Sequence, residues 1–230
     1  MTDTFGFNES GLSVRVLESA EDRHKGFRLR HAIYCDSLRW VKAQTDGLEK
    51  DEYEDGSTSL GVLTAEGALL GVVRMIPGSR PFMLESHFRS LVGPHHSVRK
   101  RADTAEVTRL ATSIMPRAYR KAPPVSCLLY KAIYRWSCAH DIRYLYLVVE
   151  TRYLKTLHRW EFPCMPIGPA RLLGVDGWCV AALLDWDTFR TKAAACPSLF
   201  TAWITDCHPK TQAPRPWLWP GHGCAPPVSA

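Results

Sequence analysis

The chain has 230 residues, of which 46% are hydrophobic and 23% are charged, and its 29 Lys and Arg against 23 Asp and Glu leave a net charge of +6. These proportions exclude a wholly disordered chain, which has less apolar content and a larger net charge. No apolar run approaches the roughly 20 residues that span a bilayer, and Met1 to Thr4 lack the basic and apolar pattern of a secretory signal. The sequence therefore predicts a folded cytoplasmic protein without a membrane span.

The predicted elements alternate between strands and helices. In chain order, the apolar patterns predict a strand at 12–17, a helix at 21–38, a hairpin of strands at 59–64 and 69–76, a short helix at 82–91, a strand at 105–112, a helix at 125–140, a strand at 144–149, a short helix at 152–159 and a last strand at 178–184. The run at 144–149 is typical of a strand buried on both faces. This order predicts an α/β (α+β) sandwich around a mixed sheet, forming one domain over residues 1–205. A Pro- and Gly-rich tail over 206–230 is not expected to form regular structure.

The eight cysteines argue against a metal site. They are scattered, and no Cys-x-x-Cys or Cys-x-x-x-Cys pair exists, so the ligand spacing of a structural zinc site is missing. The acidic segment 46–55 also lacks the alternating ligands and central Gly of a calcium loop. We therefore expect no metal, and we interpret the cysteines as reduced and mostly buried.

Charged residues interrupt several of the apolar elements. Arg30 lies in the first predicted helix, Arg74 lies inside a predicted strand, and Glu106 and Arg109 interrupt another. Along a strand, Glu106 and Thr108 share one face, and Arg109 points to the other face unless a bulge intervenes. Because burying an isolated charge is costly, such groups pair with each other at strand ends or surround a charged ligand.

The acidic segment Glu49 to Asp55 has two interpretations. The simpler one is a solvated turn. The other is a wall of carboxylates for a cationic ligand, completed by Tyr34 and Trp40, whose rings can stack on a flat group or on a cation. The sequence alone leaves both open.

Three blocks of residues together resemble a known family. The blocks are Leu29-Arg30-His-Ala-Ile-Tyr34 with Trp40 and Glu49-x-Asp51-x-Tyr53-Glu54; Leu70-Gly-Val-Val-Arg74-Met-Ile-Pro with Pro81-Phe82-Met83-Leu84 and Phe88; and Ala105-Glu106-Val-Thr108-Arg109-Leu-Ala111. In this order, over roughly residues 12–185, they are similar to the acyl-homoserine lactone synthases of the LuxI type.

The resemblance implies a three-layer fold like that of the acetyl-CoA-dependent N-acetyltransferases (GNAT), with a mixed sheet flanked by helices. It also implies an acyltransferase without a bound cofactor, whose substrates are S-adenosylmethionine and an acyl thioester on acyl carrier protein or coenzyme A. The α-amine would take the acyl group, and the carboxylate would then close onto the γ-carbon, expelling methylthioadenosine and leaving a lactone.

The same resemblance assigns residues to this chemistry. It places Arg30, Tyr34, Trp40, Asp51, Glu54, Arg74, Phe82 and Thr108 in the S-adenosylmethionine site and Glu106 and Arg109 in the catalytic centre. Asp51 and Glu54 would face cationic or ribose groups, and Arg30 or Arg109 would hold the carboxylate. Glu106 would be the general base, directly or through a water, because the amine must lose a proton and a carboxylate in a dry cleft can have a raised pKa. Tyr34, Glu54 and Thr108 stand where the family usually has Phe, Asp and Ser, and each keeps the chemical type.

The acyl chain and its carrier are assigned in the same way. Val149 would line the acyl pocket, which lacks the paired threonines of members that prefer 3-oxo chains. Lys155 and Arg159 lie four apart on one helical face, where the family places residues that meet acyl carrier protein, although a solvated basic face fits equally well. The basic loop with Arg117, Arg120 and Lys121 would bind a phosphate of either donor.

Two alternatives remain at this point. An N-acyl amino acid synthase or an exosortase-associated acyltransferase shares the fold and the donor but uses a different amine. A nucleic-acid-binding module is the more distant one. The chain shows none of the usual nucleic-acid motifs, and the acidic segment 49–55 would repel phosphate, so we expect no nucleic-acid partner.

Overall fold

The computed structural model describes residues 5–173 and 177–206. Its strands form one mixed sheet in the order β1-β2-β3-β4-β5-β6-β9-β7, with β8 paired to β9. The strands are β1 (Gly6–Glu9), β2 (Leu12–Val16), β3 (Thr58–Leu63), β4 (Leu69–Pro77), β5 (Thr104–Thr112), β6 (Tyr144–Glu150), β7 (Met165–Pro166), β8 (Arg171–Leu173) and β9 (Gly177–Asp185). Described neighbours pair antiparallel except β5 and β6, which are parallel.

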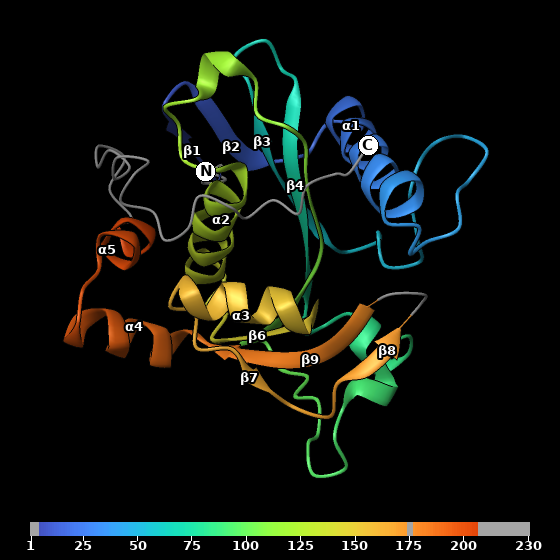
Figure 1. Cartoon of the computed structure of the whole chain (residues 1–230), viewed down its shortest axis with the longest axis vertical. Helices are drawn as coiled ribbons and strands as arrows, with labels where there is room; N and C mark the ends of the chain where they lie inside the picture. The colour runs from blue at the N-terminus through green and yellow to red at the C-terminus, as the bar shows by residue number, and fades with distance from the viewer. Residues whose placement is uncertain (1–4, 174–176, 207–230) are drawn as a thin grey trace.

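Helices pack on both faces of this sheet. On one face α1 (Ala20–His31) brings Gly26 against Leu17 and Val72. On the other face lies α2 (Val125–Ala139), and an added Cβ on Gly71 would come within 2.4 Å of Val125. Only a glycine lets β4 and α2 approach this closely. The remaining α-helices are α3 (Thr151–Arg159), α4 (Trp186–Ala195) and α5 (Leu199–Thr205), and α4 and α5 lie on the side of the molecule away from α1 (Figure 1).

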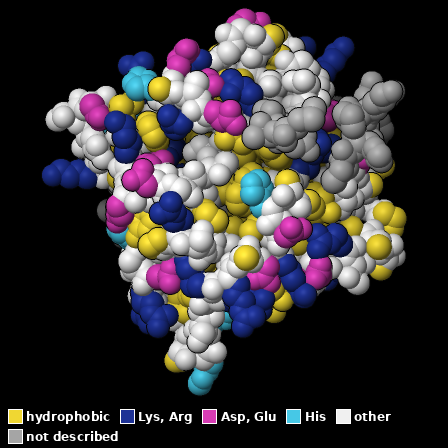
Figure 2. All heavy atoms as spheres, turned by 180° about the vertical axis from the view of Figure 1, so that it is seen from behind, with side chains coloured by type: hydrophobic (Ala, Val, Ile, Leu, Met, Phe, Trp, Pro, Cys, Tyr) yellow, Lys and Arg dark blue, Asp and Glu magenta, His cyan; other side chains and the backbone are white. Residues whose placement is uncertain are grey.

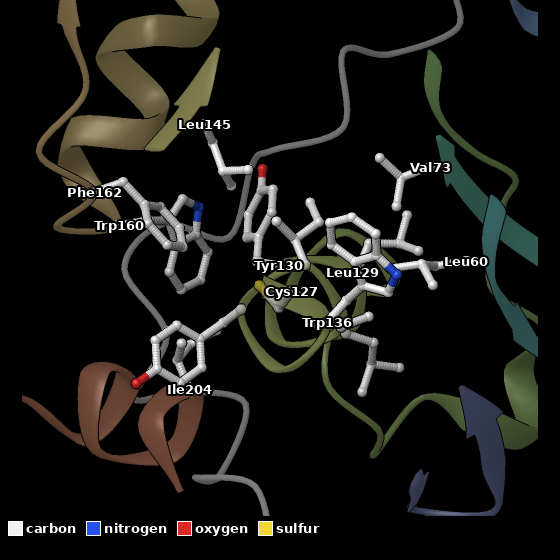
Figure 3. Packing of buried hydrophobic residues seen from close by; sticks show 14 of the residues in the cluster. Leu60, Val73, Cys127, Leu129, Tyr130, Trp136, Leu145, Trp160, Phe162 and Ile204 are labelled. Carbon is white, nitrogen blue, oxygen red and sulfur yellow. The ribbon is translucent and has the colours of Figure 1, made fainter. Parts of the chain in front are cut away.

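The main core lies between α2 and the sheet. Figure 3 shows Leu60 and Val73 from the strands beside Leu129 of α2, with Trp160 and Phe162 packed at the other end of the cluster. Burying one such side chain on folding stabilises the folded state by about 1.5–3 kcal/mol. The core packs against one face of the sheet and holds the strands in place. The opposite face of the sheet carries the charged residues described below.

Most of the predicted elements are confirmed. The structure has the strands predicted at 12–17, 59–64, 69–76, 105–112, 144–149 and 178–184, the helices predicted at 125–140 and 152–159, and the mixed sheet flanked by helices. The helix predicted at 21–38 begins as α1 and continues as a π-helix, η1 (Ala32–Ser37). Of the six described cysteines, four are buried, and Cys138 and Cys196 are exposed.

Two expectations are wrong, and several elements were missed. The segment 82–91 is two 3-10 turns, η2 (Met83–Glu85) and η3 (Arg89–Leu91), because contacts to Glu106 hold its amides in place of a continuous helix ladder. Strand β6 is fully buried only at Leu145 and Tyr146, because its pairing with β5 ends at Leu147 and the two strands separate beyond it. The missed elements are β1, β7, β8, α4, α5 and the 3-10 turn η4 (Arg117–Tyr119).

The Pro- and Gly-rich tail lies outside the described residues from Cys207 onward. None of the helices over residues 5–173 and 177–206 has the length and apolar character that a membrane span requires.

Candidate active site

Three arginines and three carboxylates form a closed ring of alternating charge on the α1 face of the sheet. Following the ring, the nitrogen-to-oxygen distances are 2.5 Å for Arg30–Glu49, 2.9 Å for Glu49–Arg109, 3.0 Å for Arg109–Asp51, 2.5 Å for Asp51–Arg74, 2.6 Å for Arg74–Glu54 and 2.7 Å for Glu54–Arg30. Each group therefore has two neighbours of opposite sign. The ring carries no net charge, which is the condition for keeping so many ionised groups away from water.

The ring joins elements that are far apart in the sequence. Arg30 projects from α1, Arg74 from β4 and Arg109 from β5, and all three hold the acidic segment that follows η1. Arg74 is completely buried, and its Nε also donates to Thr108 Oγ1 at 3.0 Å. The interpretation of the acidic segment as a solvated turn is therefore wrong for Glu49, which is 1% exposed. It is also wrong for Asp51 and Glu54, the other two carboxylates of the ring.

Arg109 reaches the ring through a β-bulge. Opposite β4, the register of β5 shifts between Arg74↔Thr108 and Val72↔Ala111, so one extra residue is inserted on β5. Arg109 accordingly has a φ of 54°, in the left-handed region that non-glycine residues seldom occupy. Without the bulge Arg109 would point to the opposite face from Thr108. The bulge therefore decides that both side chains serve one site.

Charge pairing also sets the protonation state of Asp51. Burial by itself would raise the pKa of this carboxyl, but the hydrogen bonds and charge of Arg74 and the charge of Arg109 outweigh burial and hold the pKa below its usual range. Asp51 is therefore a permanent anion near neutral pH. Arg74 contacts it through both Nη atoms, at 2.5 and 2.9 Å, the two-pronged geometry that makes arginine–carboxylate pairs specific.

A cavity of about 330 Å³ adjoins the ring on its outer side. Its lining combines carboxylates, cations, aromatic rings and a thioether: Trp40, Val41, Lys42, Glu49, Lys50, Asp51, Tyr53, Met83, His87 and Arg109. Met83 Sδ lies 3.3 Å from Arg74 Nη2, so this thioether contacts both the cavity and the completely buried Arg74.

The π-helix positions the aromatic wall of this cavity. Its widened turn is closed by Leu38 N–H donating to Ile33 O at 2.8 Å, and Trp40 N–H then donates to Tyr34 O at 2.9 Å. Tyr34 Oη donates to Leu110 O at 2.7 Å, and burial raises the pKa of this phenol to about 12, so Tyr34 stays protonated. Trp40 remains 47% exposed at the cavity, 6.2 Å from the Tyr34 ring. A π-helical turn is a frequent marker of functional sites.

Glu106 lies beneath the η2 turn and not among the residues that line the cavity. Its two carboxylate oxygens accept hydrogen bonds from Met83 N–H at 2.7 Å and Leu84 N–H at 2.9 Å, and its side chain is almost completely buried. Burial raises the pKa of Glu106 to about 7, against the lowering effect of those two amides and of the positive charges of Arg74 and Lys100. Glu106 is therefore a carboxyl that exchanges a proton near neutral pH.

The structure divides the predicted site residues into two groups. Trp40, Asp51 and Arg109 line the cavity. The others are not among the residues that line it: Arg30, Tyr34, Glu54, Arg74, Phe82, Glu106 and Thr108. Phe82, for example, is fully buried with Lys100 Nζ 3.4 Å from its ring centre.

The sequence analysis missed several residues that line the cavity. Glu49 belongs to the ring, and its place in the acidic segment Glu49 to Asp55 was the signal, although only Asp51 and Glu54 of that segment were assigned to the site. His87 and Met83 approach from the η2 segment, and nothing in their local pattern distinguishes His87 from an ordinary loop residue. Only the tertiary structure brings them to the cavity.

The remaining predicted residues lie elsewhere. Val149 is half-buried on β6 and packs against the main core, on the sheet face opposite the ring. The basic residues predicted to meet the acyl carrier are all exposed: Lys155 and Arg159 on α3, and Arg117, Arg120 and Lys121 in and after η4. On the face turned away from the view of Figure 1, basic and acidic side chains are interleaved around a central apolar area (Figure 2).

Comparison with known proteins identifies relatives of this chain in sequence and in fold. The family model described as autoinducer synthase matches residues 15–193. An acyl-homoserine-lactone synthase of Aeromonas salmonicida is 26% identical over 144 residues, covering 62% of this chain and 69% of the relative. The structure of the AHL synthase LasI superposes with a TM-score of 0.68 at 19% identity, covering 76% of this chain and 90% of LasI. The CoA-dependent acyl-homoserine lactone synthase BjaI, solved with SAM and isopentyl-CoA, gives a TM-score of 0.62 at 23% identity over 80% of this chain and 92% of BjaI.

A mixed sheet with helices on both faces and relatives of this kind define an acyltransferase with a GNAT-like fold. The chain belongs to the autoinducer synthase family, whose model covers most of its length.

Proposed function

We propose that this protein is an acyl-homoserine lactone synthase, with residues 1–205 acting as one catalytic domain. It transfers an acyl group from a thioester to the α-amine of S-adenosylmethionine and then closes the lactone with release of methylthioadenosine, making a quorum-sensing signal. The observation that carries this proposal is the cavity beside the charged ring, because it offers the kinds of group that S-adenosylmethionine requires.

The cavity and the substrate match group by group. S-adenosylmethionine carries a sulfonium and an ammonium, a carboxylate and a flat adenine. Glu49 and Asp51 present carboxylate oxygens, Arg109 presents a guanidinium, and Trp40 presents a flat ring. A carboxylate has about four acceptor positions. Asp51 fills them with Arg74, Arg109 and the Tyr53 amide, whereas Glu49, bonded to Arg30 and Arg109, retains capacity for a substrate cation.

The ring behind the cavity holds these groups in place. Arg30, Arg74 and Glu54 are assigned a supporting role, since they fix the two carboxylates and Arg109 without lining the cavity. Such preorganisation lets the site bind a zwitterion without rearranging its own charges. Thr108 supports Arg74 in the same way.

Glu106 is assigned the role of general base, acting through a water. A base near neutral pKa combines a useful ionised fraction with sufficient basicity, and the pKa of Glu106 is about 7. The thioester is already activated, so no cysteine or serine nucleophile is required. Val149 is assigned to the acyl pocket, next to the part of the sheet where β5 and β6 separate.

The decisive experiment is to incubate the purified chain with S-adenosylmethionine and a panel of acyl-CoA and acyl carrier protein thioesters. We expect release of methylthioadenosine together with an acyl-homoserine lactone, both measured by liquid chromatography and mass spectrometry. Acyl transfer to a free amino acid without methylthioadenosine would instead identify an N-acyl amino acid synthase and would contradict the proposal.

Trp40 allows a direct test of the aromatic wall. Trp40→Ala is expected to weaken S-adenosylmethionine binding about tenfold with little change in kcat, because stacking on an aromatic ring contributes about 1–3 kcal/mol and each 1.4 kcal/mol is tenfold. Titration calorimetry measures the loss. Trp178→Ala is the matched control, since Trp178 is 59% exposed on β9 and does not line the cavity. Equal affinities of the two variants would contradict the assignment of Trp40.

The carrier is tested through α3. If acyl carrier protein docks there, the double variant Lys155→Glu, Arg159→Glu should raise KM for the acyl carrier protein donor about tenfold and leave KM for acyl-CoA unchanged. The wild-type KM for the protein donor should rise with salt, because exposed charges are screened. Lys192→Glu, an exposed change on α4, serves as the control. An unchanged KM for the protein donor would show that α3 is an ordinary solvated face.

A further inference from the structure

Three side chains form a connected set at the edge of the cavity. His87 Nδ1 lies 3.0 Å from Tyr53 Oη, and His87 Nε2 lies 3.6 Å from Glu52 Oε1. Tyr53 and His87 both line the cavity, and the His87 side chain is half exposed while Tyr53 is buried. The imidazole therefore touches the cavity, the solvent and a carboxylate at the same time.

Two hydroxyls occupy one imidazole nitrogen: Nδ1 lies 3.0 Å from Tyr53 Oη and 3.2 Å from Ser86 Oγ. Tyr53 Oη lies 2.5 Å from Ser86 Oγ, and Ser86 Oγ lies 3.5 Å from Met83 O, a carbonyl that only accepts. In the tautomer in which Nδ1–H donates to one of these hydroxyls, the lone pair is on Nε2. Nε2 is also the nitrogen without a hydroxyl partner among the described residues, and it faces Glu52 Oε1 at 3.6 Å.

We propose that His87 is a catalytic residue that takes the first proton from the α-ammonium of the substrate, with Tyr53 and Glu52 as positioning residues. The inference rests on the proposed function. This imidazole lies between the cavity and bulk water, so a proton taken from the substrate can leave.

The chemistry requires such an exit. The ammonium must lose one proton before its nitrogen has an electron pair for the thioester carbonyl, and that proton has to leave the site. One N–H bond of the ammonium breaks, its electron pair stays on nitrogen, and a new N–H bond forms at His87 Nε2. The imidazolium then gives the proton to water. The second proton, released when the amide forms, passes through Glu106 to the departing thiolate, so the two groups serve different steps.

The surrounding charges support this assignment. Glu52, which precedes Tyr53 in the acidic segment, stabilises the imidazolium of His87. The Tyr53 phenol oxygen accepts a hydrogen bond from Nδ1–H in this protonated state. Across the cavity lie the anions Glu49 and Asp51, each already paired within the ring, and the cations Arg109, Lys42 and Lys50. Glu52 is thus the carboxylate within ion-pair distance of His87 among the described residues. The negative charge of Glu52 stabilises the protonated imidazole of His87 against repulsion by those cations.

The test is the pH dependence of kcat/KM for S-adenosylmethionine in His87→Gln. We expect kcat/KM to fall about 100-fold at pH 7, as for removal of a general base. The difference from wild type should narrow as pH rises, because the substrate ammonium then loses its proton to solvent without help. Added imidazole should restore activity to His87→Gly. Tyr53→Phe and Glu52→Gln should show smaller losses with the same pH trend. His95→Gln, an exposed histidine that does not line the cavity, is the matched control.

The outcomes separate this inference from the function on which it rests. A wild-type protein that releases no methylthioadenosine with any donor overturns the function, and the inference with it. An active wild type with an unchanged His87→Gln profile overturns the inference alone. A constant loss at every pH, without imidazole rescue and with weaker S-adenosylmethionine binding by calorimetry, also overturns it, because His87 would then only contact the substrate.

Discussion

Replacement of Glu106 by Gln is expected to lower kcat by about 10²–10⁴-fold, the range observed for a lost general base, with KM for S-adenosylmethionine changed only slightly. The physical reason is that the carboxylate, whose pKa is about 7, lies beneath the cavity and not in its lining. Losing it removes a proton acceptor and leaves the binding groups in place. Steady-state kinetics with saturating thioester separate kcat from KM.

The pH dependence of the wild type has a definite sign. Because a base works in its ionised form, kcat should fall as pH drops below about 7, where Glu106 becomes protonated. Unlike His87→Gln, the Glu106→Gln variant should not recover at high pH, and unlike His87→Gly it should not recover with added imidazole.

A structural role for Glu106 predicts something else. Gln offers one acceptor oxygen to the amides of Met83 and Leu84, which now bond to two. If the only role of Glu106 is to anchor η2, Glu106→Gln should lower thermal stability and raise KM while kcat stays near wild type. Such a result, with the melting temperature recorded for each variant, would remove Glu106 from the chemistry.

Replacement of Glu49 by Gln is expected to produce the largest loss of stability, about 3–5 kcal/mol, because breaking a buried ion pair leaves its partner charge uncompensated. Glu49 and Arg30 are each 1% exposed, and Glu49 also holds Arg109. Both arginines would keep one carboxylate instead of two. For a chain of this size each kcal/mol lowers Tm by about 2–4 °C, and calorimetry or urea unfolding measures the change.

The control is Glu18→Gln, an exposed carboxylate outside the ring. It should change the unfolding free energy by no more than about 0.5 kcal/mol, as is usual for surface substitutions. A Glu49→Gln variant as stable as this control would mean that the ring contributes binding geometry and not stability.

Local pattern was sufficient to predict most of the sheet. Strands β3, β4 and β5 and helix α2 have apolar spacings that match one period of secondary structure, so their identity does not depend on distant contacts. The π-helix and the two turns η2 and η3 were not predicted in this way, and η2 depends on hydrogen bonds to a residue elsewhere in the chain. That residue is Glu106.

The candidate site shows the same division. The sequence by itself determined the presence of charges of both signs inside apolar elements, and hence that these groups had to find partners, since isolated buried charges are too costly. Their arrangement was decided by the tertiary structure. The bulge in β5 turns Arg109 to the α1 face, the fold brings Glu49 under Arg30, and the η2 turn carries His87 to the cavity. These placements depend on which strands pair and where a register shifts, and no local pattern of residue types encodes that.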